Sequence, residues 1–100
     1  MAAIRHIVPV SLNYNEGDPR IQEFFDAAKE LLSSIPCVHE YHHYKQIQAD
    51  TPFQYGFVLE FKSEEDFQEF MSDPNEEEFT LKYWNMAVKG FMDCNFVAFE

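Results

Sequence analysis

His6 is the histidine whose setting in the sequence points most clearly to proton transfer. It lies in an apolar, β-branched run, IRHIVPVSLN, over residues 4–13. An imidazole changes its charge near neutral pH, so one that faces a pocket can act as a general acid or base. The alternative is a hydrogen-bonded histidine in the core of a central strand, and the sequence alone supports both interpretations.

The other three histidines lack the spacing of a metal site. His39, His42 and His43 lie in a predicted strand, so His39 and His43 share a face and His42 points away. The strand rise places His39 and His43 roughly 13 Å apart, too far for one ion. Unless a dimer brought two such faces together, we expect no metal held by side chains.

The acidic run Glu76-Glu77-Glu78, with Asp73 before it, is a second group that could do chemistry. It lacks the alternating oxygen ligands and central glycine of an EF-hand loop, which argues against Ca²⁺. Negative charge is favourable in the first turn of a helix, and that is the interpretation we prefer. Cys37 and Cys94 are interpreted as small apolar side chains.

Composition excludes several classes of function. The chain has 100 residues, which predicts a single domain over residues 1–100. Its net charge is −11, so nucleic acid and anionic membrane are disfavoured as partners because both need a basic surface. Two cysteines and an N-terminus without a signal-like apolar region predict a cytoplasmic protein.

The stretch from Gln54 to Pro74 carries the clearest structural pattern. Its first half alternates large apolar residues at a period of two, which predicts a strand: Tyr55, Phe57, Leu59 and Phe61. Ser63 followed by Asp66 is a helix N-cap signal, and an apolar stripe follows it: Phe67, Phe70 and Met71. Asp73-Pro74 ends this helix and opens the next.

Similar patterns predict the other elements. A strand over residues 4–13 should be buried on both faces, with a bulge or a missing pair at Pro9. Asp18-Pro19 starts an amphipathic helix that ends at Ile35-Pro36. Residues 38–48 predict a strand that forms a hairpin with the next one. A helix over residues 75–89, ended by Gly90, precedes a last strand over residues 91–99.

The order βαββααβ predicts an α+β, ferredoxin-like fold with an antiparallel four-stranded sheet of order 4-1-3-2. The helices should cover one face of that sheet. The other face would expose a set of apolar side chains: Ile7, Pro9, Val58, Val97 and Phe99. Such a patch marks an interface, so we expect a homodimer through the open sheet face, forming an α/β barrel.

Several pieces of the sequence together resemble the stress-responsive α/β-barrel (Dabb) family. They are IRHIVPV, SIPCVHEY, YGFVLEFKSEEDFQEFMSDP and the closing FVAFE, spread over residues 4–100. The resemblance implies a dimeric ferredoxin-like barrel. Most members of the family have no established activity, and some plant members are heat-stable oligomers. One resembled member is a plant polyketide cyclase that closes a linear polyketide by aldol condensation.

The cyclase's working residues are only partly kept. Its first-strand histidine corresponds to His6, and its pocket histidine corresponds to Tyr55. Its catalytic tyrosine corresponds to Phe70, which has no hydroxyl. Its catalytic histidine corresponds to Glu76, and Asp73 replaces the first histidine of an H-P-x-H turn. Because the base and its hydroxyl partner are both replaced, we do not expect that aldol mechanism.

The preferred interpretation is a homodimeric stress-responsive α/β-barrel protein of undefined activity, for which a small apolar ligand is a candidate partner and no cofactor is expected. The alternative is a small cofactor-free enzyme, cyclase-like or monooxygenase-like, that uses His6 with Glu76 and Tyr55. The predicted ligand pocket consists of His6, Phe24, Tyr55, Phe57, Phe70, Phe79 and Trp84. An enzyme should have an enclosed pocket of about 300 Å³ or more beside His6. A non-catalytic protein should have that space filled by five aromatic rings, those of Phe24, Phe57, Phe70, Phe79 and Trp84. The resemblance also implies a cation site on the main-chain carbonyls of Leu32, Ile35 and Val38.

Overall fold

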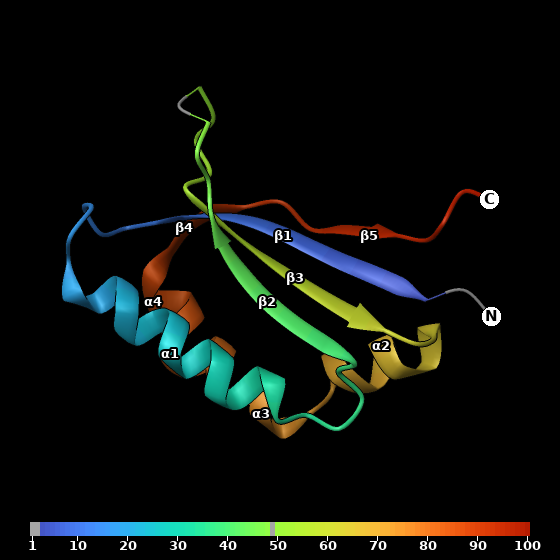
Figure 1. Cartoon of the computed structure of the whole chain (residues 1–100). Coiled ribbons are helices and arrows are strands. Elements are labelled where there is room, and N and C mark those ends of the chain that lie inside the picture. Colours follow the sequence, from blue (N-terminus) through green and yellow to red (C-terminus); the bar gives the residue numbers. More distant parts are fainter. Residues whose placement is uncertain (1–2, 49) are drawn as a thin grey trace.

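The structure is a computed structural model that describes residues 3–48 and 50–100 (Figure 1). Its helices and strands, in chain order, are β1 (Ile4–Leu12), α1 (Pro19–Ser33), β2 (Glu40–Lys45), β3 (Tyr55–Phe61), α2 (Glu64–Met71), α3 (Pro74–Phe79), the π-helical segment η1 (Thr80–Trp84), α4 (Asn85–Ala87), β4 (Val88–Phe91) and β5 (Cys94–Phe96). In these residues, no helix is long and apolar enough to cross a membrane.

The strands form one antiparallel sheet in the order β2-β3-β1-β4, and β5 pairs with β1 beyond the end of β4. The helices lie on one face of the sheet (Figure 1). This is the predicted ferredoxin-like fold, with the predicted strand order 4-1-3-2. Its last strand consists of two pieces, β4 and β5.

The core lies between the sheet and the helices, and strand alternation explains its composition. Every second residue of β1 and β3 is buried on the helix side, including Val10 and Phe61, both fully buried. Helix α1 contributes Phe24 and Phe25, whose rings lie 5.9 and 5.4 Å from that of Phe57 on β3. The period of two in the sequence therefore identifies the inner face correctly.

The predicted helix starts are confirmed by their capping bonds. Asp18, Ser63 and Asp73 accept backbone N–H bonds from Arg20, Asp66 and Asn75 at the starts of α1, α2 and α3. Each cap satisfies a backbone donor that the first helical turn leaves without a partner. The Asp73 cap is the one that places Glu76 in the first turn of α3.

The predicted end of the third helix is wrong. Helical structure ends at Ala87, and Val88–Phe91 forms β4. Gly90 does not cap a helix but lies in this strand opposite Ser11, whose hydroxyl donates to the Gly90 carbonyl at 3.3 Å. A side chain at residue 90 would approach the Ser11 hydroxyl to 3.3 Å, so glycine fits this close pairing.

The predicted last strand, residues 91–99, is interrupted where it passes Pro9. β4 pairs with Val10–Leu12 and β5 with Arg5–Ile7, so no strand pair is formed at Pro9 on this edge. This confirms the predicted missing pair, because proline has no N–H to donate. On its other edge Pro9 lies opposite Gly56 in regular register.

The open face, meaning the sheet face away from the helices, differs from prediction at its last strand. Cys94 lies opposite Ile7 and Phe96 opposite Arg5, so Cys94 and Phe96 belong to this face. Asn95 shares the inner face with His6, so the predicted alternation is shifted by one residue, and Val97 and Phe99 lie beyond the end of β5.

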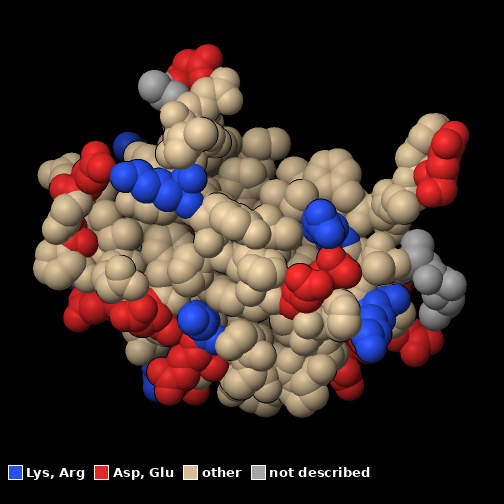
Figure 2. Space-filling view, in the orientation of Figure 1, with Lys and Arg blue, Asp and Glu red and all other residues tan. Residues whose placement is uncertain are grey.

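Two further features frame the sheet. β2 is shorter than predicted, covering Glu40–Lys45 rather than residues 38–48, and its hairpin with β3 projects from the body of the domain (Figure 1). Figure 2 shows that basic side chains on this side form small separate groups among acidic ones, with acidic groups along α1.

Candidate functional site

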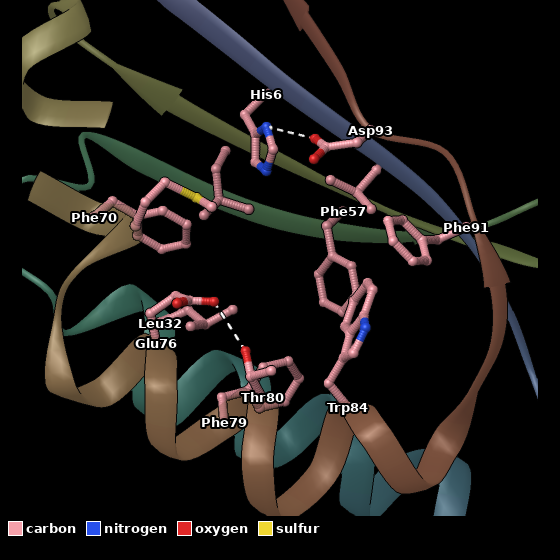
Figure 3. Close-up of a pocket in the computed structure, with 13 residues that line it drawn as sticks. His6, Leu32, Phe57, Phe70, Glu76, Phe79, Thr80, Trp84, Phe91 and Asp93 are labelled. Atoms are coloured by element: carbon pink, nitrogen blue, oxygen red, sulfur yellow. Dashed lines mark hydrogen bonds and ion pairs between the residues drawn. The ribbon is translucent and has the colours of Figure 1, made fainter. Parts of the chain in front are cut away.

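A cavity of about 240 Å³ lies between the inner sheet face and the helical segments that follow α2 (Figure 3). Its walls are mainly apolar and include Leu32, Phe57, Phe70, Phe79 and Trp84. Phe91, Met71 and Asp93 also line it, and each is about half exposed, so the cavity is not enclosed. It is thus slightly smaller and more open than predicted for an enzyme, and four of the five predicted aromatic rings line it.

His6 enters this cavity from the inner face of β1. The residue is only 8% exposed, and its ring centroid lies 5.2 Å from that of Phe67 and 6.3 Å from that of Phe70. Its Nδ1 lies 2.7 Å from Oδ1 of Asn95 and 3.5 Å from Oδ1 of Asp93. The side chain is therefore fixed by aromatic packing on one side and by two oxygens on the other.

These contacts determine which ring nitrogen of His6 can act as a base. A carboxylate and an amide oxygen only accept hydrogen bonds, so Nδ1 must carry the proton that they bind. Nε2 of the neutral ring then keeps its lone pair. Figure 3 shows Nε2 on the side of the ring turned into the cavity, away from Asp93.

A first prediction concerns this tautomer. Replacing both acceptors, in the double variant Asp93→Ala and Asn95→Ala, should remove the preference for a proton on Nδ1. Long-range ¹⁵N–¹H NMR of the neutral ring should show protonated Nδ1 in the wild type and a mixed population in the variant. Asn85→Ala, at an exposed position on α4 that does not line the cavity, is the control. Unchanged His6 ¹⁵N shifts in the double variant would contradict the assignment.

Glu76 lies in the first turn of α3 and also lines the cavity, as Figure 3 shows. Burial raises the pKa of its carboxyl group, and the charges of Glu77 and Asp73 add to this. The hydrogen bond from the Thr80 hydroxyl, 2.9 Å from Oε2 of Glu76, opposes the shift, as does His6. The pKa of Glu76 is raised on balance, so Glu76 stays protonated to a higher pH than an exposed glutamate does.

A second prediction follows from this pKa shift. The native state holds the Glu76 proton more tightly than the unfolded chain does, so the associated stability is present at low pH. It is lost as pH rises past the ordinary pKa of 4.5 and through the raised one. Glu76→Gln cannot ionise and should gain stability relative to the wild type between about pH 4 and pH 7.

Urea unfolding at several pH values would measure this difference. Thr80→Val is the matched variant, because losing the hydroxyl should raise the pKa of Glu76 further and extend the wild-type loss to higher pH. Parallel stability curves for the wild type and Glu76→Gln would contradict the prediction.

The family follows from a comparison of the whole chain. The model of the "Stress responsive A/B Barrel Domain" (Dabb) matches residues 4–97. The chain belongs to the Dabb family. This confirms the resemblance noted in the sequence, and no curated protein sequence matches the chain.

Solved structures share the Dabb fold over nearly the full chain. A ferredoxin-like Dabb protein from Mesorhizobium loti is 24% identical with a TM-score of 0.95, covering 100% of both chains. A dimeric ferredoxin-like protein of unknown function from Thermobifida fusca is 17% identical with a TM-score of 0.82, covering 97% of this chain and 92% of that one. A hydroxynitrile lyase from Passiflora edulis is 18% identical with a TM-score of 0.84, covering 98% and 94%.

Two residues predicted for the pocket of this Dabb chain do not line the cavity. Tyr55 lies at the other end of β3, opposite Val10, where it lines a separate cavity of about 340 Å³ near the hairpin. Phe24 packs behind the wall, 5.3 Å from the ring of Phe79. Among the described residues, no hydrogen bond or ion pair joins His6 to Glu76, although both line the same cavity.

Sequence reasoning missed the two residues that orient His6. Asp93 and Asn95 are polar residues two apart on a predicted strand, which places them on one face. The predicted strand order also placed that strand beside the one with His6. What the sequence could not supply was the register that brings Asn95 opposite His6.

The proposed main-chain cation site lies at the end of α1 in this Dabb chain. The Leu32 carbonyl accepts from the Ile35 N–H at 3.3 Å, and the Ile35 carbonyl accepts from the Val38 N–H at 3.0 Å. Both carbonyls thus already take part in turn hydrogen bonds. The site remains an expectation from the family resemblance.

Proposed function

We propose that this Dabb chain binds a small, mainly apolar carbonyl compound in the cavity and transfers a proton on it without a cofactor. The observation that supports this most is the placement of His6 and Glu76, which reach one apolar cavity from the sheet and from α3. One offers a lone pair and the other a carboxyl group whose pKa is raised by burial. Such a pair separates base and acid roles by environment.

The proposed step is enolisation. Nε2 of His6 takes the proton from the carbon next to the carbonyl, and the C–H electron pair forms the new carbon–carbon double bond. The carbonyl π electrons move to oxygen, which receives the proton of Glu76. Asp93 and Asn95 stabilise the imidazolium through Nδ1. Atoms and charge balance with no external oxidant or reductant.

The cavity walls favour a particular kind of ligand. Phe57, Phe79 and Trp84 offer aromatic faces, which suit a planar aromatic or aliphatic compound. A volume of about 240 Å³ limits the ligand to a small molecule. The hydroxynitrile lyase at 18% identity shares the fold, and the proposal depends on this chain's own residues rather than on that likeness.

Two NMR measurements on the same panel of small aromatic and aliphatic ketones and aldehydes test the proposal. Saturation transfer detects binding, and incorporation of solvent deuterium next to the carbonyl detects proton transfer. We expect binding of at least one aromatic ketone, and deuterium incorporation faster than in buffer. Binding without incorporation would leave a ligand-binding protein and refute the catalytic step, and no binding at all would refute both.

We also propose that the chain is a homodimer formed through its open face. Apolar groups there are incompletely covered: Phe96 and Tyr44 are each 55% exposed, and Ile7, Pro9 and Val58 are half-buried. The Thermobifida fusca protein of the same fold is described as dimeric. Burying this face against a second copy would remove the exposed apolar surface from water.

A third prediction tests this interface. Phe96→Arg places a charge on the open face and should weaken the dimer by at least about 100-fold, because an unpaired charge would be buried. Leu81→Arg, at a 65% exposed position on η1, is the matched control and should leave the dimer intact. Sedimentation equilibrium gives the dimer dissociation constants of both variants. A wild-type monomer at micromolar concentration, or equal dimerisation of both variants, would contradict the proposal.

A further inference from the structure

A group of metal-ligating side chains lies at the end of the sheet near the start of β2, outside the cavity. His39, Glu40 and Glu60 each direct one ligand atom to this place, and these atoms all lie within 4.8 Å of one another. His39 directly precedes β2, and its backbone N–H donates to the Glu60 carbonyl at 2.8 Å. The backbone of two adjacent strands therefore holds the three side chains together.

The group brings two carboxylates together across the β2–β3 pair. Glu40 lies directly opposite Glu60 in the pairing of β2 with β3, and like charges in that position destabilise a sheet. Arg5 neutralises part of this, with Nη2 3.0 Å from Oε2 of Glu60. Among the described residues, Glu40 pairs with the half-exposed His42 imidazole, whose Nε2 lies 3.1 Å from its Oε1. A divalent ion would compensate both carboxylates at once.

The existing contacts leave room for such an ion. Among the described residues, the Arg5 and His42 pairs each engage one carboxylate oxygen, so the second oxygen of Glu40 and of Glu60 can bind metal. Ligand atoms around a tetrahedral Zn²⁺ lie about 3.3 Å apart, given bonds of about 2.0–2.1 Å. The exposed side chains of His39 and Glu40 can close from 4.8 Å to that spacing around the partly buried Glu60 by small rotamer changes.

We propose that His39, Glu40 and Glu60 form a binding site for a divalent transition-metal ion, with Zn²⁺ as the probe and water completing its coordination. One imidazole with two carboxylates is a ligand set that suits Zn²⁺ better than Ca²⁺ or Mg²⁺, which prefer oxygen alone. The site does not depend on the proposed function of the cavity. In this site the partners of His39 are two glutamates, not His42 or His43.

Isothermal titration of the full chain with Zn²⁺ at neutral pH tests the site, with the absorption of bound Co²⁺ reporting the ligand geometry. We expect one ion per chain, and binding weakened at least about tenfold in His39→Ala and in Glu60→Gln. Glu64→Gln, the same change at an exposed position on α2, is the matched control and should bind like the wild type. The wild type should also gain thermal stability with Zn²⁺.

The free thiol of Cys37 is a competing ligand for Zn²⁺. Cys37 lines a cavity with His39, Asp66 and Glu69, and its sulfur could capture Zn²⁺ instead. Cys37→Ser should leave the binding constant unchanged if the ion is held as proposed. Loss of binding in Cys37→Ser but not in Glu60→Gln would overturn the assignment. Absence of saturable binding below about 1 mM would also overturn it.

Discussion

His6→Gln is expected to slow deuterium incorporation into a bound ketone by roughly 10²–10⁴-fold, the usual contribution of a positioned general base. Glutamine has a similar size and keeps a polar end, so the ligand should still bind in the cavity. The amide cannot take a proton near neutral pH. The variant therefore removes the base but keeps the shape of the cavity. Rates at saturating ketone, followed by NMR, measure the effect.

His42→Gln is the matched control for this variant. It makes the same change on the open face, where the side chain of His42 is half exposed and contacts Glu40 rather than the cavity. Its exchange rate should equal that of the wild type. If His6→Gln exchanges deuterium as fast as His42→Gln does, the imidazole of His6 is not the base, although the cavity would still be a binding site.

The position of a candidate residue could be predicted from the sequence where one residue alone carries the signal. His6 lies among apolar residues at a period of two, and that places it on the inner face without knowledge of any partner. Glu76 was identified through the family resemblance, and the cap at Asp73 explains its position in α3. The orienting residues Asp93 and Asn95 depend on the register of two strands far apart in sequence, which a single sequence does not encode locally.

The fold shows the same division between local and long-range information. Capping residues and apolar stripes located the starts of α1, α2 and α3, because those signals act within one helical turn. The end of the third helix was misplaced because Gly90 matches the local pattern of a helix end. Its true role, close pairing with Ser11, depends on a contact between residues 79 positions apart.

The metal-ligating group at the end of the sheet shows why spacing along one strand was insufficient. His39 and His43 lie too far apart to bind one ion, and that argument still holds. Yet Glu60, twenty residues beyond Glu40, is its direct neighbour across the β2–β3 pair. Cross-strand neighbours, rather than residues on the same strand, supply the second and third ligands.

Phe61→Ala is expected to destabilise the protein by about 3–5 kcal/mol, the range for removing a buried aromatic ring. Phe61 has no exposed surface, and its ring centroid lies 5.1 Å from that of Phe70 and 5.5 Å from that of Phe67. The empty volume would lie between the sheet and α2, where no neighbour can fill it without moving. Urea unfolding at a fixed protein concentration gives the free energy, and the melting temperature should fall by at least about 12 °C.

Phe99→Ala removes the same ring at a position that is 98% exposed and should change stability by less than about 0.5 kcal/mol. Equal losses in the two variants would contradict the assigned core. Phe61 also packs 6.4 Å from the His6 ring, so its removal should loosen the base as well as the fold. Phe61→Leu separates these effects, because it keeps most of the volume and the fold while it removes the aromatic contact that helps to hold the imidazole. A slower proton exchange in Phe61→Leu, at nearly wild-type stability, would show that the aromatic core positions His6 for chemistry.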